Sequence, residues 1–306
     1  NMSRLFYFFL CTALLLLVSC DRNTELAEDQ IYIELCGNSE LDTTNFSVLS
    51  FNRLSSTSFN SVSMVVNQLQ PDFIGIQESY EIGKQIADRY NYCLYGNDAK
   101  STAILSKYPV EVINDMYVKI ILNQNQHLHF FNIHLPANPY QPYDIRDTLI
   151  TTESQAIHQA EQTRGEYVDD LLFYVNQIDD TMPIVVTGDF NEPSHLDWVA
   201  GSENPIRFQI GDAPFTVNWP ASNKMLNSGL IDAYRSVYTN PIDYQGYTWT
   251  PIINLNEVHD RIDFVYHNSS ISVNSVFLIG PDNMSDIKIS SYESDHRGVL
   301  VNFSFN

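Results

Sequence analysis

Short apolar runs, rich in β-branched and aromatic residues, recur along the chain between polar, turn-forming segments. Runs of this kind are typical of strands that are buried on both faces. They predict strands at Phe46–Phe51, Phe73–Ile76, Thr102–Leu105, Val110–Leu122, Leu128–Ile133, Ile184–Thr187, Ile262–Tyr266, Ile271–Leu278 and Gly298–Phe305. Several of these runs end in a polar side chain that can take part in chemistry.

Apolar positions at helical spacing predict helices at Ser61–Leu69, Ile82–Tyr90 and Thr152–Gln177. In the longest of them, one face is expected to hold Ala156, Ala160, Tyr167, Leu171 and Val175. Strands and helices alternate in the N-terminal half, whereas the C-terminal half is richer in strand and turn signals. This order favours an α/β fold, a four-layer sandwich of two packed mixed β-sheets flanked by helices, over an all-parallel sheet.

The N-terminal residues have the pattern of an export signal. Arg4 precedes an apolar run from Leu5 to Val18, and Leu17-Val18-Ser19-Cys20 has the small-residue pattern of a lipoprotein cleavage box. The run is shorter than the roughly 20 apolar residues that a membrane span needs. We expect a lipoprotein signal peptide at 1–19, an acidic tether at 20–45 and a single domain at 46–306. A plain secretory peptide or an uncleaved anchor is the alternative.

A lipidated Cys20 would anchor the protein in the cell envelope, on the periplasmic side or at the cell surface. After cleavage, Cys36 and Cys93 would remain. They can pair in an oxidising compartment, but the apolar surroundings of Cys93 favour a buried thiol.

Acidic residues greatly outnumber basic ones: 37 Asp and Glu against 16 Lys and Arg give a formal charge of -21. This balance leaves no basic surface for neutralising nucleic-acid phosphates, so it disfavours sequence-independent nucleic-acid binding. An acidic chain can still act on phosphate esters if a divalent cation supplies positive charge locally.

Side chains suited to such chemistry follow the ends of successive predicted strands. Each of them alone is more often structural, but together they indicate one site. They are Asn52, Glu78 after Gln77, His134, Asp189 and Asn191 within Gly188-Asp189-Phe190-Asn191, Asp263 within Arg261-Ile262-Asp263-Phe264, and Asp295 and His296 after Ser294.

The residue types suggest roles. A carboxylate held at a strand end, such as Glu78, is a good ligand for a hard cation. Alternation along the backbone can point Asp189 and Asn191 to the same side. Asp295 can face a metal while His296 serves as an acid, a base or a positive charge.

This ordered set of motifs resembles the endonuclease/exonuclease/phosphatase superfamily over essentially all of Phe46 to Phe305. The resemblance implies that Glu78 is the principal metal ligand, with Asn52 and Asp295 completing or supporting the site. The implied ion is Mg2+, with Mn2+ as an alternative.

The same resemblance implies in-line attack of water on a phosphate. Asp189 would orient or deprotonate the water, and Asn191 would hold a phosphate oxygen. His134 would contact the phosphate or assist the leaving group. His296, oriented by Asp263, would stabilise the developing charge.

Three functions remain open. The first is a monomeric phosphodiesterase or phosphatase that acts on a small organic or lipid-type ester. The second is a secreted nuclease, which is weakened because Tyr95–Ser106 offers no clear match to a tyrosine that some family nucleases carry in the active site. The third is a non-catalytic binding lipoprotein, which is disfavoured because no polar motif is missing.

Further residues near the motifs bear on specificity. The segments Pro136–Tyr143 and Asn218–Ser222, rich in proline and aromatics, are candidates for the walls of a substrate pocket, with packed surface loops as the alternative. His195, Asp197 and His259 either shape specificity or have local structural roles, and the latter is favoured.

Overall fold

The computed structural model describes residues 33–34, 44–253 and 256–306. Within these residues the strands form two seven-stranded mixed sheets. The first sheet has the order β1 (Ile33–Glu34), β6 (Val110–Asn114), β7 (Tyr117–Asn123), β8 (Gln126–His134), β9 (Ile184–Asp189), β11 (Asp263–His267), β10 (Ile231–Asp232). The second has the order β13 (Ile287–Lys288), β12 (Ile271–Gly280), β14 (Gly298–Phe305), β2 (Asn45–Asn52), β3 (Phe73–Gln77), β5 (Thr102–Ser106), β4 (Cys93–Asn97).

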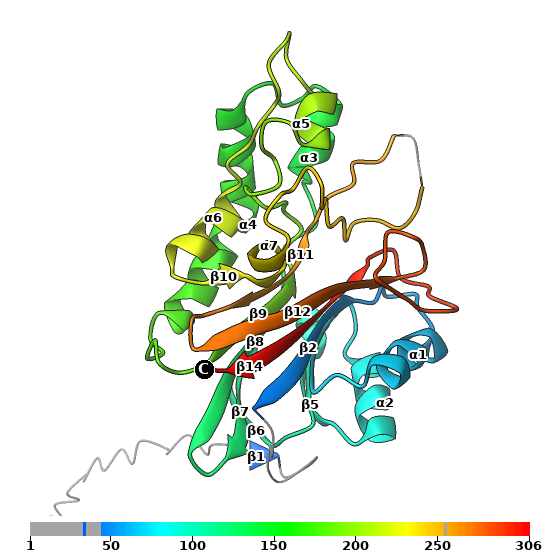
Figure 1. The fold of residues 1–306 in the computed structure, drawn as a ribbon, viewed down its shortest axis with the longest axis vertical. Coiled ribbons are helices and arrows are strands. Elements are labelled where there is room, and N and C mark those ends of the chain that lie inside the picture. The colour runs from blue at the N-terminus through cyan, green and yellow to red at the C-terminus, as the bar shows by residue number, and fades with distance from the viewer. Residues whose placement is uncertain (1–32, 35–43, 254–255) are drawn as a thin grey trace, which may run out of the picture. The chain divides into compact units, whose positions relative to one another are not determined.

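Helices cover the outer faces of both sheets (Figure 1). The described helices are α1 (Phe59–Leu69), α2 (Glu81–Tyr90), α3 (Gln141–Arg146), α4 (Glu153–Val175), α5 (Glu203–Arg207), α6 (Pro220–Asn227), α7 (Ala233–Val237) and the short 3-10 helix η1 (Asp98–Lys100). Apolar residues of α1 and α2 pack on the second sheet, and those of α4 and α6 pack on the first. The predicted α/β four-layer sandwich is confirmed.

The inner faces of the two sheets form the central core. Phe46 and Phe73 of the second sheet pack against Phe130 and Val265 of the first, and all four are almost completely buried. Burying a side chain of this size stabilises the folded state by roughly 1.5–3 kcal/mol relative to leaving it in water. The core therefore explains why the apolar runs in the sequence coincide with strands.

Side-chain caps fix the starts of the long helices. The Ser58 hydroxyl accepts a hydrogen bond from Ser61 N–H at the start of α1, and Thr152 accepts one from Gln155 N–H at the start of α4. On α4, the buried face contains Ala156, Ala160, Val168, Leu171 and Val175. Tyr167, which we predicted on this face, is instead 51% exposed, because the stripe passes through the neighbouring Val168.

The predicted single strand Val110–Leu122 is wrong, because this run folds back on itself as the hairpin of β6 and β7. Met116 N–H donates to the side-chain oxygen of Asn114, which closes a turn of the type that asparagine favours. Two residues of the predicted tether, Ile33 and Glu34, pair with β6. The rest of the tether up to residue 43 and the predicted signal peptide lie outside the described residues.

Two further findings concern Cys93 and the helices. The expected free thiol at Cys93 is wrong, since Cys93 is disulfide-bonded. No helix in the described part of the chain is long and apolar enough to cross a membrane.

The strand directions bring the ends of four strands and the starts of two others to one edge of the sandwich. β2 runs parallel to β3, and β8 runs parallel to β9. β11 and β14 are antiparallel to β9 and β2, so they start where their neighbours end. The polar residues at these positions therefore meet at one edge, although they lie far apart in the sequence.

Candidate active site

Hydrogen bonds across the two sheets hold the site together. Asn52 ends β2, and its amide group donates to Asp189 Oδ2 of the other sheet (2.8 Å) and to Glu78 Oε1 (3.2 Å). Its side-chain oxygen accepts from Leu54 N–H (3.0 Å). Asn52 thus links the two carboxylates through its nitrogen, while its oxygen, the atom that would bind a metal, is used within the loop.

Glu78 directly follows β3 and reaches the cavity from a left-handed backbone conformation, with φ of 66°. Such a conformation is costly for a non-glycine residue and often occurs at functional sites. Besides its bond to Asn52, Glu78 accepts a hydrogen bond from Ser55 N–H at 2.8 Å.

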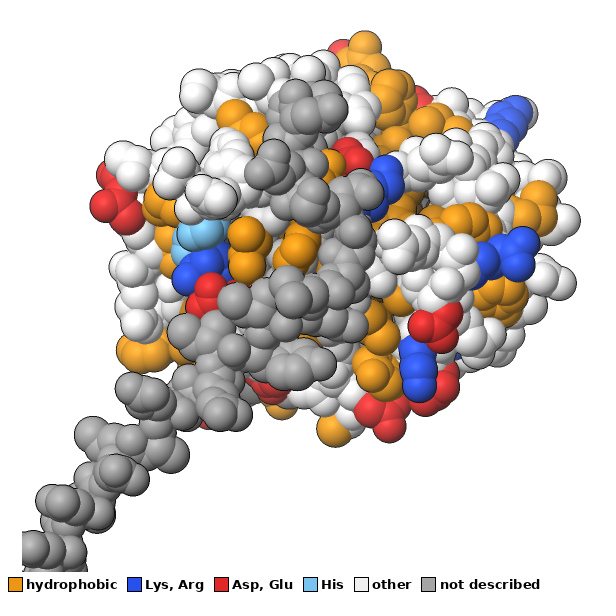
Figure 2. Space-filling view, turned by 90° about the horizontal axis from the view of Figure 1, so that it is seen from below, with side chains coloured by type: hydrophobic (Ala, Val, Ile, Leu, Met, Phe, Trp, Pro, Cys, Tyr) orange, Lys and Arg blue, Asp and Glu red, His pale blue; other side chains and the backbone are white. Residues whose placement is uncertain are grey.

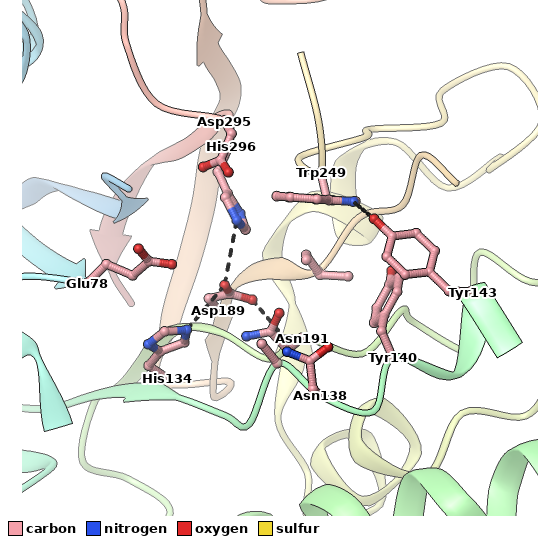
Figure 3. A pocket seen from close by; sticks show the side chains of 12 residues that line it. Glu78, His134, Asn138, Tyr140, Tyr143, Asp189, Asn191, Trp249, Asp295 and His296 are labelled. Atoms are coloured by element: carbon pink, nitrogen blue, oxygen red, sulfur yellow. Dashed lines mark hydrogen bonds and ion pairs between the residues drawn. The ribbon is translucent and has the colours of Figure 1, made fainter. Parts of the chain in front are cut away.

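Asp189, at the end of β9, lies at the centre of the site (Figure 3). It is buried, and its Oδ2 lies 3.6 Å from His134 Nε2 and 3.8 Å from His296 Nε2. Its Oδ1 accepts from Asn191 N–H at 2.8 Å. Burial and the neighbouring Asp263 raise the pKa of Asp189, and the two histidines oppose that change.

His296 and Asp263 form a buried pair. His296 Nδ1 lies 2.8 Å from Asp263 Oδ2, and the ring also faces Asp189 through Nε2. Burial alone would lower the pKa of His296, but Asp263 and Asp189 together raise it to about 10. The two carboxylates therefore favour the cationic form of the imidazole.

The structure thus brings all eight predicted site residues to the same edge of the sandwich. Six of them line a cavity of about 290 Å3, whereas Asn52 and Asp263 lie behind it and contact its lining residues. The lining residues from the predicted set are Glu78, His134, Asp189, Asn191, Asp295 and His296.

The donor set around Glu78 and Asp295 fits a hard divalent cation. Both side chains line the cavity, and Asp295 Oδ1 is a buried oxygen without a hydrogen-bond partner in the structure. Burial raises the pKa of Asp295, His296 opposes that rise, and the nearby carboxylate of Glu78 adds to it.

A second candidate donor cluster comprises Asp189, Asp263 and His296, with ligand atoms within 4.8 Å of one another. Here the cationic imidazole already compensates both carboxylates. An oxygen-rich position at Glu78 and Asp295 is also the more typical environment for Mg2+.

Aromatic side chains form the wall of the cavity opposite Glu78 (Figure 3). Tyr140, Tyr143 and Trp249 line it, with Tyr143 Oη accepting from Trp249 Nε1 at 3.1 Å. The first two belong to the segment Pro136–Tyr143, which we expected to wall a pocket, and the structure confirms that expectation. These tyrosines follow His134 in the sequence, and no tyrosine of Tyr95–Ser106 lines the described cavity.

Sequence reasoning missed Trp249 and the acid that supports this wall. Trp249 forms backbone hydrogen bonds with Asp260, and the Trp249 ring lies 4.9 Å from that of His296. Asp260 is buried and accepts hydrogen bonds from Tyr140 Oη (2.7 Å) and Trp198 Nε1 (2.8 Å). Asp260 directly precedes the Arg261-Ile262-Asp263 motif, and this position was the one signal available in the sequence.

The second predicted wall segment, Asn218–Ser222, does not line the cavity. Trp219 is buried against Trp198, and Ser222 Oγ bonds to His195. Asp197 forms ion pairs with Arg235 and Arg261, and His259 Nδ1 accepts from Thr250 N–H. His195, Asp197 and His259 therefore have the local structural contacts that we favoured for them.

Comparisons with known proteins agree with this geometry. The model of the endonuclease/exonuclease/phosphatase family matches residues 46–296. An uncharacterized protein of Caenorhabditis elegans is 24% identical over 266 residues, which cover 78% of this chain and 82% of that protein.

Among solved structures, an AP endonuclease from Archaeoglobus fulgidus is similar, with a TM-score of 0.57 and 16% identity over 85% of this chain and 99% of that one. The D. rerio TDP2 structure complexed with single strand DNA product has a TM-score of 0.53 and 14% identity over 86% of this chain and all of that one. These structural likenesses show a common fold. With the family match over most of the chain, they establish that the protein belongs to the endonuclease/exonuclease/phosphatase family.

Proposed function

We propose that the protein is a metal-dependent phosphodiesterase that hydrolyses a small organic or lipid-type phosphate ester by in-line attack of water. The observation that carries this proposal is the single cavity in which Glu78 and Asp295 lie beside Asp189, His134 and His296. Carboxylates for a cation, a buried acid and two imidazoles are groups that can position water and stabilise negative charge during hydrolysis of a phosphate ester.

Glu78 and Asp295 would hold Mg2+, or alternatively Mn2+. A cation bound there would polarise a phosphate oxygen and neutralise part of the substrate's charge. Asn52 would act through its hydrogen bonds, because its amide keeps Glu78 and Asp189 at a fixed separation.

The chain's own groups would carry out the remaining steps. Asp189 would orient the attacking water and accept its proton, and His134 and Asn191 would contact phosphate oxygens. His296, held as a cation by Asp263, would stabilise the negative charge that develops on the phosphate in the transition state.

The surroundings of the site favour a small organic substrate over nucleic acid. No Lys or Arg side chain lines the cavity within the described residues. The face shown in Figure 2 carries scattered Lys and Arg side chains among acidic and apolar ones. A protein that tracks a nucleic-acid backbone needs a positively charged groove, whereas the aromatic wall of the cavity suits an organic ester arm.

A substrate panel tests this function. The mature protein is incubated with Mg2+ and an aryl phosphodiester, an aryl monoester, DNA, RNA or sphingomyelin, and Asp189→Asn serves as the inactive control. We expect hydrolysis of small diesters, loss of activity in excess EDTA and recovery with Mg2+. Full activity in EDTA would contradict the metal requirement. Preferred cleavage of DNA or RNA would favour the nuclease alternative, and binding without turnover would favour a non-catalytic lipoprotein.

We further propose that the protein works in the cell envelope, anchored through a lipid on Cys20. The support is the signal-like pattern of residues 1–20, which lie outside the described residues.

A further inference from the structure

A second cavity, of about 470 Å3, adjoins the catalytic cavity at His134 and Ala137, which line both. It lies between the end of β8, the β6–β7 turn and helix α4. The catalytic cavity, in contrast, takes Asp189 and Asn191 from the β9 side of His134. The volume of the second cavity is within the usual range of about 300–1,000 Å3 for small-molecule sites. Apart from His134 and the start of the segment Pro136–Tyr143, its lining residues lie outside the motifs identified in the sequence.

The walls of the second cavity are mainly apolar, and its charged lining residues are acidic. Met116, Leu135 and Pro136 supply apolar surface. Asp115 from the β6–β7 turn and Asp170 from α4 also line it, and no Lys or Arg does so within the described chain.

Thr102 and Asn132 are buried polar residues in the lining, and the side chain of Asn132 already has its hydrogen bonds within the protein. Its amide donates to the carbonyl oxygens of Ile76 and Ala103, and its Oδ1 accepts from Gln77. An anionic group would therefore be repelled here without any compensating donor from Asn132. An apolar group that is neutral or positively charged would be accepted.

We propose that the second cavity, which we call the arm subsite, binds one organic arm of a phosphodiester, and that this arm is apolar and neutral or cationic. The proposal rests on the proposed function and specifies its substrate class. A phosphate held at Asp189 and His134 would have the aromatic wall of Tyr140 and Tyr143 on one side and the arm subsite on the other. A diester fills both recesses, whereas a monoester leaves one of them empty.

Matched synthetic esters test the charge preference. The probes are 4-nitrophenyl phosphodiesters whose second arm is 3,3-dimethylbutyl, 2-(trimethylammonio)ethyl or 3-carboxypropyl, compared with 4-nitrophenyl phosphate. We expect kcat/KM for the diester with the cationic arm to be similar to or higher than kcat/KM for the diester with the neutral arm. The diester with the anionic arm and the monoester should be poor substrates.

Variants outside the catalytic machinery then locate the effect. Asp170→Asn and Asp115→Asn should each lower the preference for the cationic over the neutral arm by about twofold to fivefold, the usual range for a partly exposed charge pair. The matched control is Asp169→Asn, which makes the same change one residue away, where the carboxylate pairs with Lys224 and does not line the subsite. Met116→Trp, which fills the subsite, should raise KM for the diesters and leave the monoester unchanged.

The outcomes separate this proposal from the proposed function. If diesters are hydrolysed but the arm preference is the same in Asp170→Asn, Asp115→Asn and Asp169→Asn, the arm subsite is wrong and the phosphodiesterase stands. The same conclusion follows if the anionic arm is preferred. If none of the esters is hydrolysed by a protein that folds and binds Mg2+, the proposed function itself fails.

Discussion

Both carboxylate oxygens of Asp189 have polar contacts, and these contacts come from different parts of the fold. Asn52 reaches Oδ2 from the second sheet, His134 and His296 approach the same oxygen, and Asn191 N–H binds Oδ1. A carboxylate held by so many neighbours cannot change its direction without disturbing both sheets. Its position is therefore fixed before substrate arrives, which is the condition for efficient proton transfer from a bound water.

The buried pair of Asp263 and His296 leads to a prediction about coupling. His296→Ala and Asp263→Asn should each reduce kcat by about 100-fold or more, the usual range for an acid–base or electrostatic group. Because Asp263 acts through the imidazole, the double variant should lose far less than the product of the two single losses. Turnover and melting temperature are measured for all three variants.

The competing explanation makes Asp263 a purely structural strand residue. In that case Asp263→Asn would lower the melting temperature strongly, or the two losses in kcat would multiply. The exposed Asp212→Asn is the matched control for the change from acid to amide and should leave both quantities unchanged.

Glu78 gives a prediction for the metal. Glu78→Gln keeps the size of the side chain but removes a charged ligand, so the Mg2+ concentration for half-maximal activity should rise by about tenfold or more. A titration of activity against Mg2+ measures this shift. An unchanged midpoint with a lower plateau would show that Glu78 does not bind the cation.

The residues of the candidate site could be predicted because each follows or begins a strand that the sequence pattern indicates. The contacts between them could not be predicted in the same way. The order from Asn52 to His296 marks the site because each motif follows or starts a buried strand. In contrast, Trp249 and Asp260 lie in a long loop, and their contacts with Tyr140 and Tyr143 depend on how that loop folds back. Nothing in the local sequence pattern specifies those contacts.

At the level of elements, length and continuity of the apolar runs decided which predictions succeeded. The strands of the two cores are confirmed because burial on both faces leaves a continuous apolar signal. The run Val110–Leu122 carries the same signal across two strands, since the turn at Asp115 is short. Short helices such as α5 and α7 were missed because about one turn of helix leaves too little periodicity to detect.

Helix α4 also supplies a buried cation, Arg164, that holds the start of α3 and the loop before it. Arg164 donates to Gln141 Oε1 (2.6 Å) and to the carbonyl oxygen of Pro139 (3.0 Å), and its guanidinium lies 4.0 Å from Glu192. The neighbouring Ala137 and Asn138 line the catalytic cavity. Arg164 is thus a positioning residue for this wall of the cavity.

This contact predicts a pH-dependent loss of stability. Burial raises the pKa of Glu192 from 4.5 to about 7, and Arg164 opposes that rise. A raised pKa in the folded state means that the stability contributed by the protonated acid is fully present below about pH 4.5 and is lost as pH rises towards 7. Without Arg164 the loss should continue to higher pH. Arg164→Met should therefore be destabilised by about 3 kcal/mol at pH 8, and by less at pH 6.

Thermal unfolding at the two pH values checks this prediction. Adding Glu192→Gln to Arg164→Met should remove most of the extra pH dependence, because no buried acid then remains to ionise. Arg89→Met, at an exposed arginine in the last turn of α2, is the matched control and should change the melting temperature little. Equal destabilisation of Arg164→Met at both pH values would assign the effect to lost hydrogen bonds instead of to charge.

At the scale of the whole molecule, the strongly acidic chain and the proposed cation site would make opposite contributions to substrate binding. The net charge of -21 repels anions at long range, so an anionic substrate is not drawn to the protein by its overall field. A lipid anchor would offset this by holding the enzyme where the substrate concentration is high. Such an arrangement suits an envelope protein that acts on nearby esters more than one that captures dilute nucleic acid.

The proposed lipid anchor on Cys20 leads to a prediction about membrane fractionation. Cys20→Ala in the full precursor should move the protein from the membrane fraction to the soluble fraction and abolish incorporation of labelled fatty acid, since the acylated thiol is lost. Its kcat for a small soluble diester should stay unchanged, because the catalytic residues all lie in the sandwich beyond residue 45. Ser19→Ala is the matched control, since a small residue is kept before the cysteine and anchoring should persist. If Cys20→Ala still fractionates with membranes, the lipoprotein assignment fails and an uncleaved apolar segment at residues 5–18 becomes the explanation.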